Sequence, residues 1–296
     1  MSESSESLRR KIDGAFELGS VVRTMKVLAA SSITQFERAV LALDDYYRTV
    51  ELGLIAWLHQ AGTQMRLEGE AIAEKGATGV VVFGSDQGLV GQFNEVVADF
   101  AIGALNSMPG RKNVLAVGER VQGHMADAGM PVIGSFTVPN AIAAITPLVG
   151  RILIEIEAQR ERGQATQVYL FHNRPKSGAL YEPVMQRLLP LDTTWQRELA
   201  EIQWPTVNLP EIIDSSERTL RALIREYLFI SLFKACAESL ASENASRLAA
   251  MQRAEKNIDE LLETLNQNFN RQRQNAIDEE LFDVVSGFEA MNVDRK

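Results

Sequence analysis

Apolar residues in the first part of the chain recur at alternating intervals of three and four positions. The clearest run consists of Ile33, Phe36, Val40, Leu43, Tyr47, Val50, Leu54 and Trp57. This spacing draws one apolar stripe along a helix and is the heptad pattern of coiled coils. An earlier set continues the stripe toward the N-terminus: Leu8, Ile12, Ala15, Leu18, Val22, Met25 and Ala29. We therefore predict a coiled-coil helix over residues 1–60.

A second helical pattern occupies the end of the chain. Its apolar positions include Leu220, Ile224, Tyr227, Ile258, Leu262, Leu265 and Phe269. All nine prolines lie between Pro109 and Pro210, and no glycine occurs between Gly178 and Gly287. Because proline and glycine are the residues that most disfavour a helix interior, residues 211–291 are predicted to form one long coiled-coil helix. Small residues in its seam (Ala237, Ala241, Ala245) allow a partner helix to approach closely.

These two helices are too long to lie inside one globular core. At about 1.5 Å per residue they would span roughly 80 Å and 115 Å, respectively. A globular chain of this length has a radius of gyration of only about 19 Å. If both helices are rooted on the segment between them, they run antiparallel, and residue p of the first lies near residue 269 − p of the second. Met25 is then expected near Asn244, with a free end after about residue 260.

The middle of the chain alternates strand and helix patterns. Strands are predicted at 79–83, 113–117, 132–138, 166–172 and 181–191, and helices at 93–107, 119–128 and 141–162, the last kinked at Pro147. This alternation predicts an open, Rossmann-like α/β domain over residues 78–210, with 61–77 as a connector. The expected fold class is therefore α/β, a long antiparallel two-helix coiled coil plus that domain.

Candidate chemistry is sparse. A glycine-spaced loop, Gly84–Gly91, follows the first strand and precedes a helix, which is where phosphate-binding loops lie. It lacks the dinucleotide fingerprint, and no GxxxxGK[ST] motif occurs, so a structural strand-to-helix turn is the favoured interpretation, with Asp86 as a helix cap or a turn residue. The three histidines, His59, His124 and His172, are scattered. We therefore predict no catalytic residues, no metal site and no cofactor.

Composition narrows the possibilities further. The net charge of −9 and a pI of about 5.1 disfavour a broad nucleic-acid surface. Mean hydropathy is −0.08, no apolar run is long enough to span a membrane, and the polar start of the chain is not a secretory signal. The single cysteine, Cys236, excludes an internal disulfide and is expected to pack as a buried thiol.

Basic residues gather near the start of the first helix and on the expected free end of the second. They are Arg9, Arg10, Lys11, Arg23, Lys26, Arg271 and Arg273. A solvated helix face and a surface for acidic loops of a surrounding partner both fit them. An unsheathed end carrying Phe269, Ile277, Leu281, Val284 and Phe288 would be an aggregation hazard, so we expect a partner to cover it.

Several segments resemble the γ subunit of F-type ATP synthases. Residues 22–31 (VRTMKVLAAS) are similar to the family's ITKAMKMVAAS, and 85–91 (SDQGLVG) to its SDRGLCG. Residues 186–191 (QRLLPL), 241–243 (ASE) and 270–287, with NRQRQ, Ile277, Glu280 and Gly287, follow the family's remaining motifs in order. The chain departs from the family at four positions: Gln87, Val90, Asp278 and Phe288. It therefore resembles a divergent member.

The resemblance implies a central stalk, or rotor shaft, that is not itself catalytic. It would couple rotation of a membrane ring translocating H+ or Na+ to conformational cycling of the catalytic α/β subunits, for ATP synthesis or hydrolysis. The implied partners are the α and β subunits, the ε subunit and the ring of c subunits, with no nucleic acid and no insertion into the membrane. The implied location is peripheral, on the cytoplasmic face of a bacterial inner membrane or on the equivalent energy-transducing membrane. Position by position, the implied contacts to β subunits are Met25, Lys26, Arg271, Arg273, Gln274, Asp278 and Glu280.

Two other functions fit the sequence patterns alone. A coiled-coil adaptor with a non-rotary partner would share the two long helices. A nucleotide-binding α/β enzyme would use the Gly84–Gly91 loop.

Overall fold

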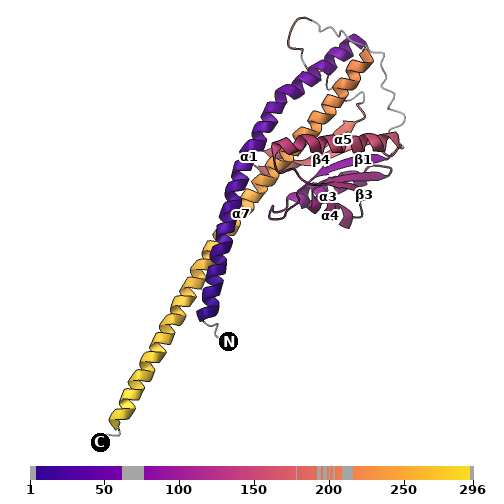
Figure 1. Cartoon of the computed structure of the whole chain (residues 1–296). Helices are drawn as coiled ribbons and strands as arrows, with labels where there is room; N and C mark the ends of the chain where they lie inside the picture. The colour runs from indigo at the N-terminus through magenta and orange to yellow at the C-terminus, as the bar shows by residue number, and fades with distance from the viewer. Residues whose placement is uncertain are drawn as a thin grey trace. The chain divides into compact units, whose positions relative to one another are not determined.

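The computed structural model describes residues 5–61, 77–177, 179–191, 195, 199, 201–202, 204–208 and 216–293. The chain divides into two compact units (Figure 1). The helix-pair unit comprises residues 1–28 and 248–296, and the larger unit comprises residues 29–247. The two units are described separately below. Most of the predicted connector, 61–77, lies outside the described residues.

The two predicted long helices are present. Helix α1 covers Ser5–Ala61 and helix α7 covers Ser216–Val293, 57 and 78 residues respectively. Both are far longer than the three to four turns of an average helix in a globular protein. The absence of proline from these segments and the long apolar stripes account for their continuity.

In the helix-pair unit, α1 and α7 run antiparallel. Leu8 and Ala15 of α1 form a buried cluster with Leu265 of α7. Further along α1, Gly19 lies beside Ile258, and Lys26 forms an ion pair with Glu255. Residue numbers thus fall on α7 as they rise on α1, as the sequence predicted.

The predicted register of this pairing is wrong. Lys26 was expected near residue 243 of α7 and instead lies at Glu255. Phe269 packs against the Leu8 cluster, so the contact with α1 continues well past residue 260, and Phe269 is not part of the free end. The shift arises because the expectation took residue 58 opposite 211 as its anchor. The helices in fact meet several residues further along α7.

One position of the predicted stripe is also wrong. The Leu18 side chain is 61% exposed, and its neighbour Gly19 is buried in its place. A Cβ atom on Gly19 would lie 3.4 Å from a methyl carbon of Ile258. Gly19 therefore allows α7 to approach closely, and Leu18 is turned toward solvent.

A five-stranded sheet forms the centre of the larger unit. Its strands are β1 (Thr78–Phe83), β2 (Lys112–Val117), β3 (Val132–Phe136), β4 (Gln167–Lys176) and β5 (Ala179–Leu189). Their order is β3-β2-β1-β4-β5, in which β5 pairs antiparallel with β4 and the other pairs are parallel. The mixed order, with one antiparallel edge strand, confirms the predicted open α/β sheet.

Alternating residues of the central strands face two different cores. On one face, Val80 and Val82 pack against helices α3 (Phe93–Asn106) and α4 (Glu119–Asp127). On the other face, Val81 and Phe83 belong to a larger cluster that includes α5 (Ile145–Glu161) and parts of α1 and α7. Figure 1 shows the sheet between these layers. The two-residue period of a strand produces this division.

Helices α1 and α7 are also antiparallel within the larger unit. Lys234 Nζ lies 2.6 Å from Asp44 Oδ1. A Cβ atom on Gly53 would meet a methyl carbon of Leu223 at 2.8 Å, so the helices approach closely there. Trp57 and Leu54 of α1 are almost fully buried. This part of the pair is therefore fixed by a large apolar core.

Pro147, where the sequence suggested a kink, lies in the first turn of a helix. A short 3-10 turn, η1 (Ile142–Ala144), precedes α5, and Pro147 is the third residue of α5. A proline in the first turn removes no helical hydrogen bond, because the amide groups there have no partner inside the helix. A proline at this place therefore does not require a kink.

Candidate functional sites

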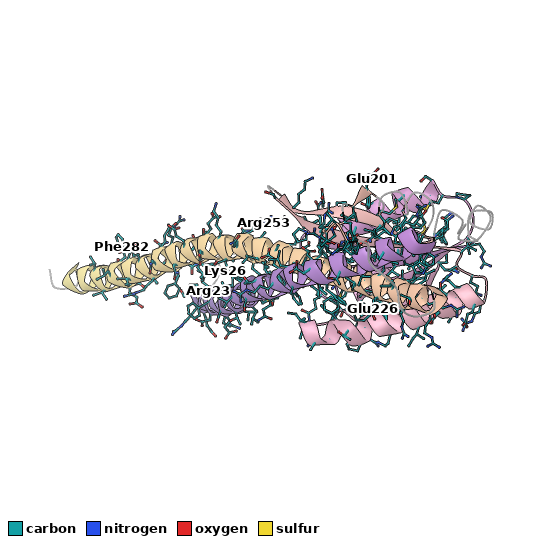
Figure 2. All side chains as sticks on the ribbon, turned by 90° about the horizontal axis from the view of Figure 1, so that it is seen from above. Arg23, Lys26, Glu201, Glu226, Arg253 and Phe282 are labelled. Carbon is teal, nitrogen blue, oxygen red and sulfur yellow. The ribbon has the colours of Figure 1, made fainter. Side chains whose placement is uncertain are left out.

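The seven residues implied as contacts lie on α1 and α7 of the helix-pair unit. Met25 and Lys26 are half-buried on α1. The other five are exposed on α7 beyond Phe269, which packs against the Leu8 cluster, and they are Arg271, Arg273, Gln274, Asp278 and Glu280. Figure 2 labels Lys26 on α1 and Phe282 on the free end of α7, by which we mean residues 273–293.

Lys26 is held within the unit rather than being a free cation. Its ammonium group forms an ion pair with Glu255, and both side chains are mostly shielded from solvent. Nearby, the Arg23 guanidinium donates a hydrogen bond to the Gly19 carbonyl oxygen at 3.2 Å. At the start of α1, Arg10 pairs with Glu6 at 3.3 Å. Part of the predicted basic cluster is thus neutralised locally.

The free end differs, because apolar side chains are exposed there. Phe282 is 73% exposed and Val284 70%, and three others are also exposed: Ile277, Leu281 and Val285. Among the described residues, no side chain forms an ion pair with Arg271, Arg273 or Glu280. A helix end with this composition is typical of a surface that a partner covers.

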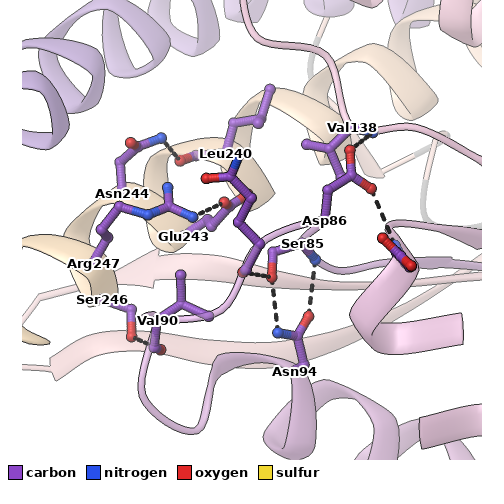
Figure 3. A network of polar contacts seen from close by, with 12 residues as sticks. Ser85, Asp86, Val90, Asn94, Val138, Leu240, Glu243, Asn244, Ser246 and Arg247 are labelled. Atoms are coloured by element: carbon purple, nitrogen blue, oxygen red, sulfur yellow. Dashed lines mark hydrogen bonds and ion pairs between the residues drawn. The ribbon is translucent and has the colours of Figure 1, made fainter. Parts of the chain in front are cut away.

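The Gly84–Gly91 loop lies at the carboxyl end of β1, and the side chains of Ser85 and Asp86 are paired within the chain. Asp86 accepts hydrogen bonds from two backbone amides, Glu119 N at 3.1 Å and Val138 N at 2.8 Å. The first of these caps the start of α4. Ser85 N donates to Asn94 Oδ1, and Asn94 Nδ2 donates to Ser85 Oγ, each at 2.8 Å (Figure 3).

This pairing favours a structural role for the loop. A phosphate needs free amide donors at such a position. Here the amides of Ser85, Glu119 and Val138 are bound by side chains of the chain itself. Asp86 also places negative charge where a phosphate would lie. The geometry therefore agrees with the capping role expected of Asp86.

A cavity of about 230 Å³ lies beside the loop within the larger unit. Its lining includes Asp86, Glu243 and Arg247. Glu243 and Arg247 form a buried ion pair of 2.6 Å. Burial raises the pKa of Glu243, and the Arg247 charge opposes that shift. A carboxylate that already has a cationic partner does not require an external ligand.

The remaining titratable groups have structural surroundings. His172 Nε2 lies 2.7 Å from Glu238 Oε2 in the interior, and His124 lies 3.6 Å from Glu95 at the surface. Burial raises the pKa of the Cys236 thiol well above its usual range. The side chain of His59 is outside the described residues. Within the part of the chain that the structure describes, no three His, Cys, Asp or Glu side chains are grouped to hold a metal.

One polar arrangement was missed by the sequence reasoning. Glu238, Ser242 and Ser246 of α7 are buried and contact β4 and the Gly84–Gly91 loop. The available signal was the spacing of four residues between them, on a helix segment with small residues and few charges. That segment was instead interpreted as a seam for a partner helix.

Comparison with known proteins relates this architecture to one family. The model of the ATP synthase family matches residues 4–291. The chain belongs to the ATP synthase family. Among curated relatives, the ATP synthase gamma chain of Nitrosomonas europaea is 27% identical, covering 97% of this chain and 99% of the relative. That of Polynucleobacter asymbioticus is 25% identical with the same coverage. These gamma chains match along the whole length.

Solved structures of ATP synthase have a similar fold. A chain of the Euglena gracilis mitochondrial ATP synthase rotor superposes with a TM-score of 0.64 at 14% identity, covering 92% of this chain and 98% of that one. A chain of the Tetrahymena thermophila mitochondrial central stalk and c-ring structure superposes with a TM-score of 0.53 at 21% identity, covering 79% of this chain and 99% of that one. In the chain described here, none of the described helices is long and apolar enough to cross a membrane.

Proposed function

We propose that this chain is the central stalk of an F-type ATP synthase. It would turn inside a head of α and β subunits and rest, with the ε subunit, on the ring of c subunits. The observation that carries the proposal is the family match over residues 4–291, which spans both long helices and the sheet between them. The chain would contribute no catalytic group, and ATP synthesis or hydrolysis would take place on its partners.

The free end of α7 supports an enclosed position for that helix. Successive residues of a helix are about 100° apart, so positions 258, 262, 265 and 269, which face α1, continue at 272 and 276. The exposed apolar residues Ile277, Leu281 and Val284 follow one position later, on a stripe turned by about 100°. That stripe is therefore directed at something other than α1.

The proposed contact residues surround this stripe. Gln274 lies within it by helical position, and Arg273 and Asp278 border it on opposite sides. Apolar side chains edged by charged ones are the usual composition of a protein–protein interface. We propose that Met25, Lys26, Arg271, Arg273, Gln274, Asp278 and Glu280 contact β subunits during rotation. Lys26 would do so while its charge is shared with Glu255.

The proposed location follows from this assembly. As part of the complex, the chain would be peripheral to the membrane, on the cytoplasmic face of a bacterial inner membrane. The two alternatives are not favoured by the comparisons. A non-rotary adaptor or a nucleotide-binding enzyme would not account for a match to gamma chains along the whole length.

Co-expression tests the proposal. A tagged chain produced with the α and β subunits from the same source should copurify with both in a complex that hydrolyses ATP. After reconstitution with the membrane ring, hydrolysis should drive ion pumping. A chain that purifies alone in the presence of those subunits, or that binds ATP by itself in a direct titration, would argue against a stalk.

A further inference from the structure

Three buried polar contacts of the larger unit lie along one ridge of α7. The ridge consists of Glu238, Ser242 and Ser246, each four residues from the next. Side chains at this spacing form one of the ridges that helices present to packing partners. All three are less than 9% exposed, and their neighbours Ala235, Ala237 and Ala241 are small and buried. The sheet can therefore approach the α7 backbone closely here.

Each residue of the ridge bonds to a different point of the α/β sheet layer. Glu238 Oε2 lies 2.7 Å from His172 Nε2 on β4. Ser242 Oγ donates to the Asn173 carbonyl oxygen at 3.1 Å. Ser246 Oγ donates to the Val90 carbonyl oxygen in the Gly84–Gly91 loop (Figure 3).

The contacts continue beyond the ridge. Asn173 Nδ2 donates to the Phe93 carbonyl oxygen at 2.9 Å, at the start of α3. The loop that receives Ser246 is itself held by Asp86 and by the Ser85–Asn94 pair. The row therefore connects α7 to β4, to α3 and to the carboxyl end of β1.

We propose that Glu238, Ser242 and Ser246 form a torsional clamp that prevents α7 from turning against the sheet under load. This inference rests on the proposed stalk function. Apolar packing is non-directional and allows a smooth helix to rotate or slide at low cost. Hydrogen bonds depend on angle as well as distance, and a buried one that breaks leaves an unsatisfied group. Three of them along two turns oppose both rotation and sliding.

The clamp concerns the transmission of torque through the chain and not the chemical reaction. Torque produced by the α and β subunits would reach α7 and must pass to the sheet layer before it can act on the ring of c subunits. A row of bonds to separate elements distributes that load over β4, α3 and the loop. The three residues are therefore positioning residues, and their loss should appear only when the complex works against a gradient.

Alanine substitutions in the reconstituted complex test the clamp. Ser242→Ala, Ser246→Ala and their double variant remove the hydroxyl donors with little change of volume. ATP hydrolysis without a gradient should stay near wild type. As the opposing ion gradient rises, hydrolysis should continue while pumping stops at a smaller gradient than in the wild type. Each lost bond should raise the rate of slippage roughly 2–10-fold, the factor that the net contribution of one hydrogen bond implies.

Ser239→Ala is the matched control. Ser239 is buried on the same turns of α7 and lies outside the ridge, about 100° around the helix from Glu238. Helix propensity changes equally in control and test variants. Glu238→Gln retains a hydrogen bond to His172, so pumping should stop at the same gradient as in the wild type. With Glu238→Ala, pumping should stop at a smaller gradient.

The outcomes separate the two proposals. If the wild-type chain supports no coupled pumping, the stalk function fails. If it does, and the alanine variants stall at the same gradient as Ser239→Ala, the clamp is refuted. If the double variant does not assemble, the single variants decide in the same way. Thermal unfolding of each complex shows whether a general loss of stability, equal with and without load, explains the result instead, which would also refute the clamp.

Discussion

A proline at position 262 tests whether stiffness of the helix pair is required for coupling. Leu262 packs against the cluster formed by Leu8, Ala15 and Leu265, near the end of the contact between α1 and α7. Proline there removes a backbone donor and its ring clashes with the preceding turn, which costs about 3 kcal/mol or more. The lost packing of a half-buried leucine adds about 1–2 kcal/mol.

The size of the cluster decides the outcome. Two buried leucines, one buried alanine and three half-buried apolar residues contribute on the order of 8 kcal/mol if a fully buried large side chain is worth about 2 kcal/mol. A penalty of about 4–5 kcal/mol removes half of this or more. We therefore expect the helices of the Leu262→Pro variant to separate locally and α7 to bend.

Leu262→Ala separates stiffness from packing. It loses the same side-chain contacts and keeps the helix, so it should reduce stability by only about 1–2 kcal/mol. In reconstituted complexes, the ratio of ions pumped to ATP hydrolysed should be close to wild type for Leu262→Ala. For Leu262→Pro it should be strongly reduced while hydrolysis continues. Equal ratios for the two variants would refute the reasoning that a stiff helix pair transmits the rotation.

Three further predictions concern the larger unit. Gly84→Ala should lower the free energy of unfolding by about 2 kcal/mol or more, because the new Cβ atom would lie 2.4 Å from Val121. Gly103→Ala, in an open part of α3, should raise the free energy of unfolding by about 0.5–1 kcal/mol. Urea unfolding of both variants measures these changes. Cys236 should resist alkylation in the native chain and react after denaturation, because burial raises its pKa; modification at the native rate of an exposed thiol would contradict this. Burial raises the pKa of Glu51 above its ordinary value of 4.5, so this carboxyl favours the folded state at low pH and loses that contribution as the pH rises through the raised value. Glu51→Gln should remove this loss of stability at rising pH. Parallel pH–stability curves for the two proteins would rule out a contribution from Glu51.

Periodicity was sufficient to predict the elements but not their register. The alternation of three and four residues identified α1 and α7, and the prolines confined the sheet to the middle of the chain. Register depends on where two stripes meet, and that is decided by close contacts such as Gly19 with Ile258 and Gly53 with Leu223. A glycine in a helix pattern indicates a close approach without indicating the residue that approaches.

The role of the loop illustrates a second limit. Sequence spacing placed Gly84–Gly91 correctly between a strand and a helix. It could not show that the Asp86 carboxylate is already paired, because one of the amides that donate to it belongs to Val138, which is 52 positions away. The ridge on α7 was missed for the same reason, because its bonding partners are distant in the sequence. Ser242 and Ser246 look like small seam residues until Asn173 and Val90 are placed opposite them.

The distribution of polarity along α7 departs from the usual one in two places, and this links the two proposals. Between residues 231 and 246 the helix is almost completely buried, yet it carries Glu238, Ser242 and Glu243. At its free end the helix is exposed, yet it carries Phe282 and Val284. Buried polar groups are retained where they have partners, and here those partners fix the angle of the helix. Exposed apolar groups are retained where another molecule covers them. A helix held by directional bonds at one end and sheathed by apolar contact at the other can turn within its sheath while remaining fixed to its base.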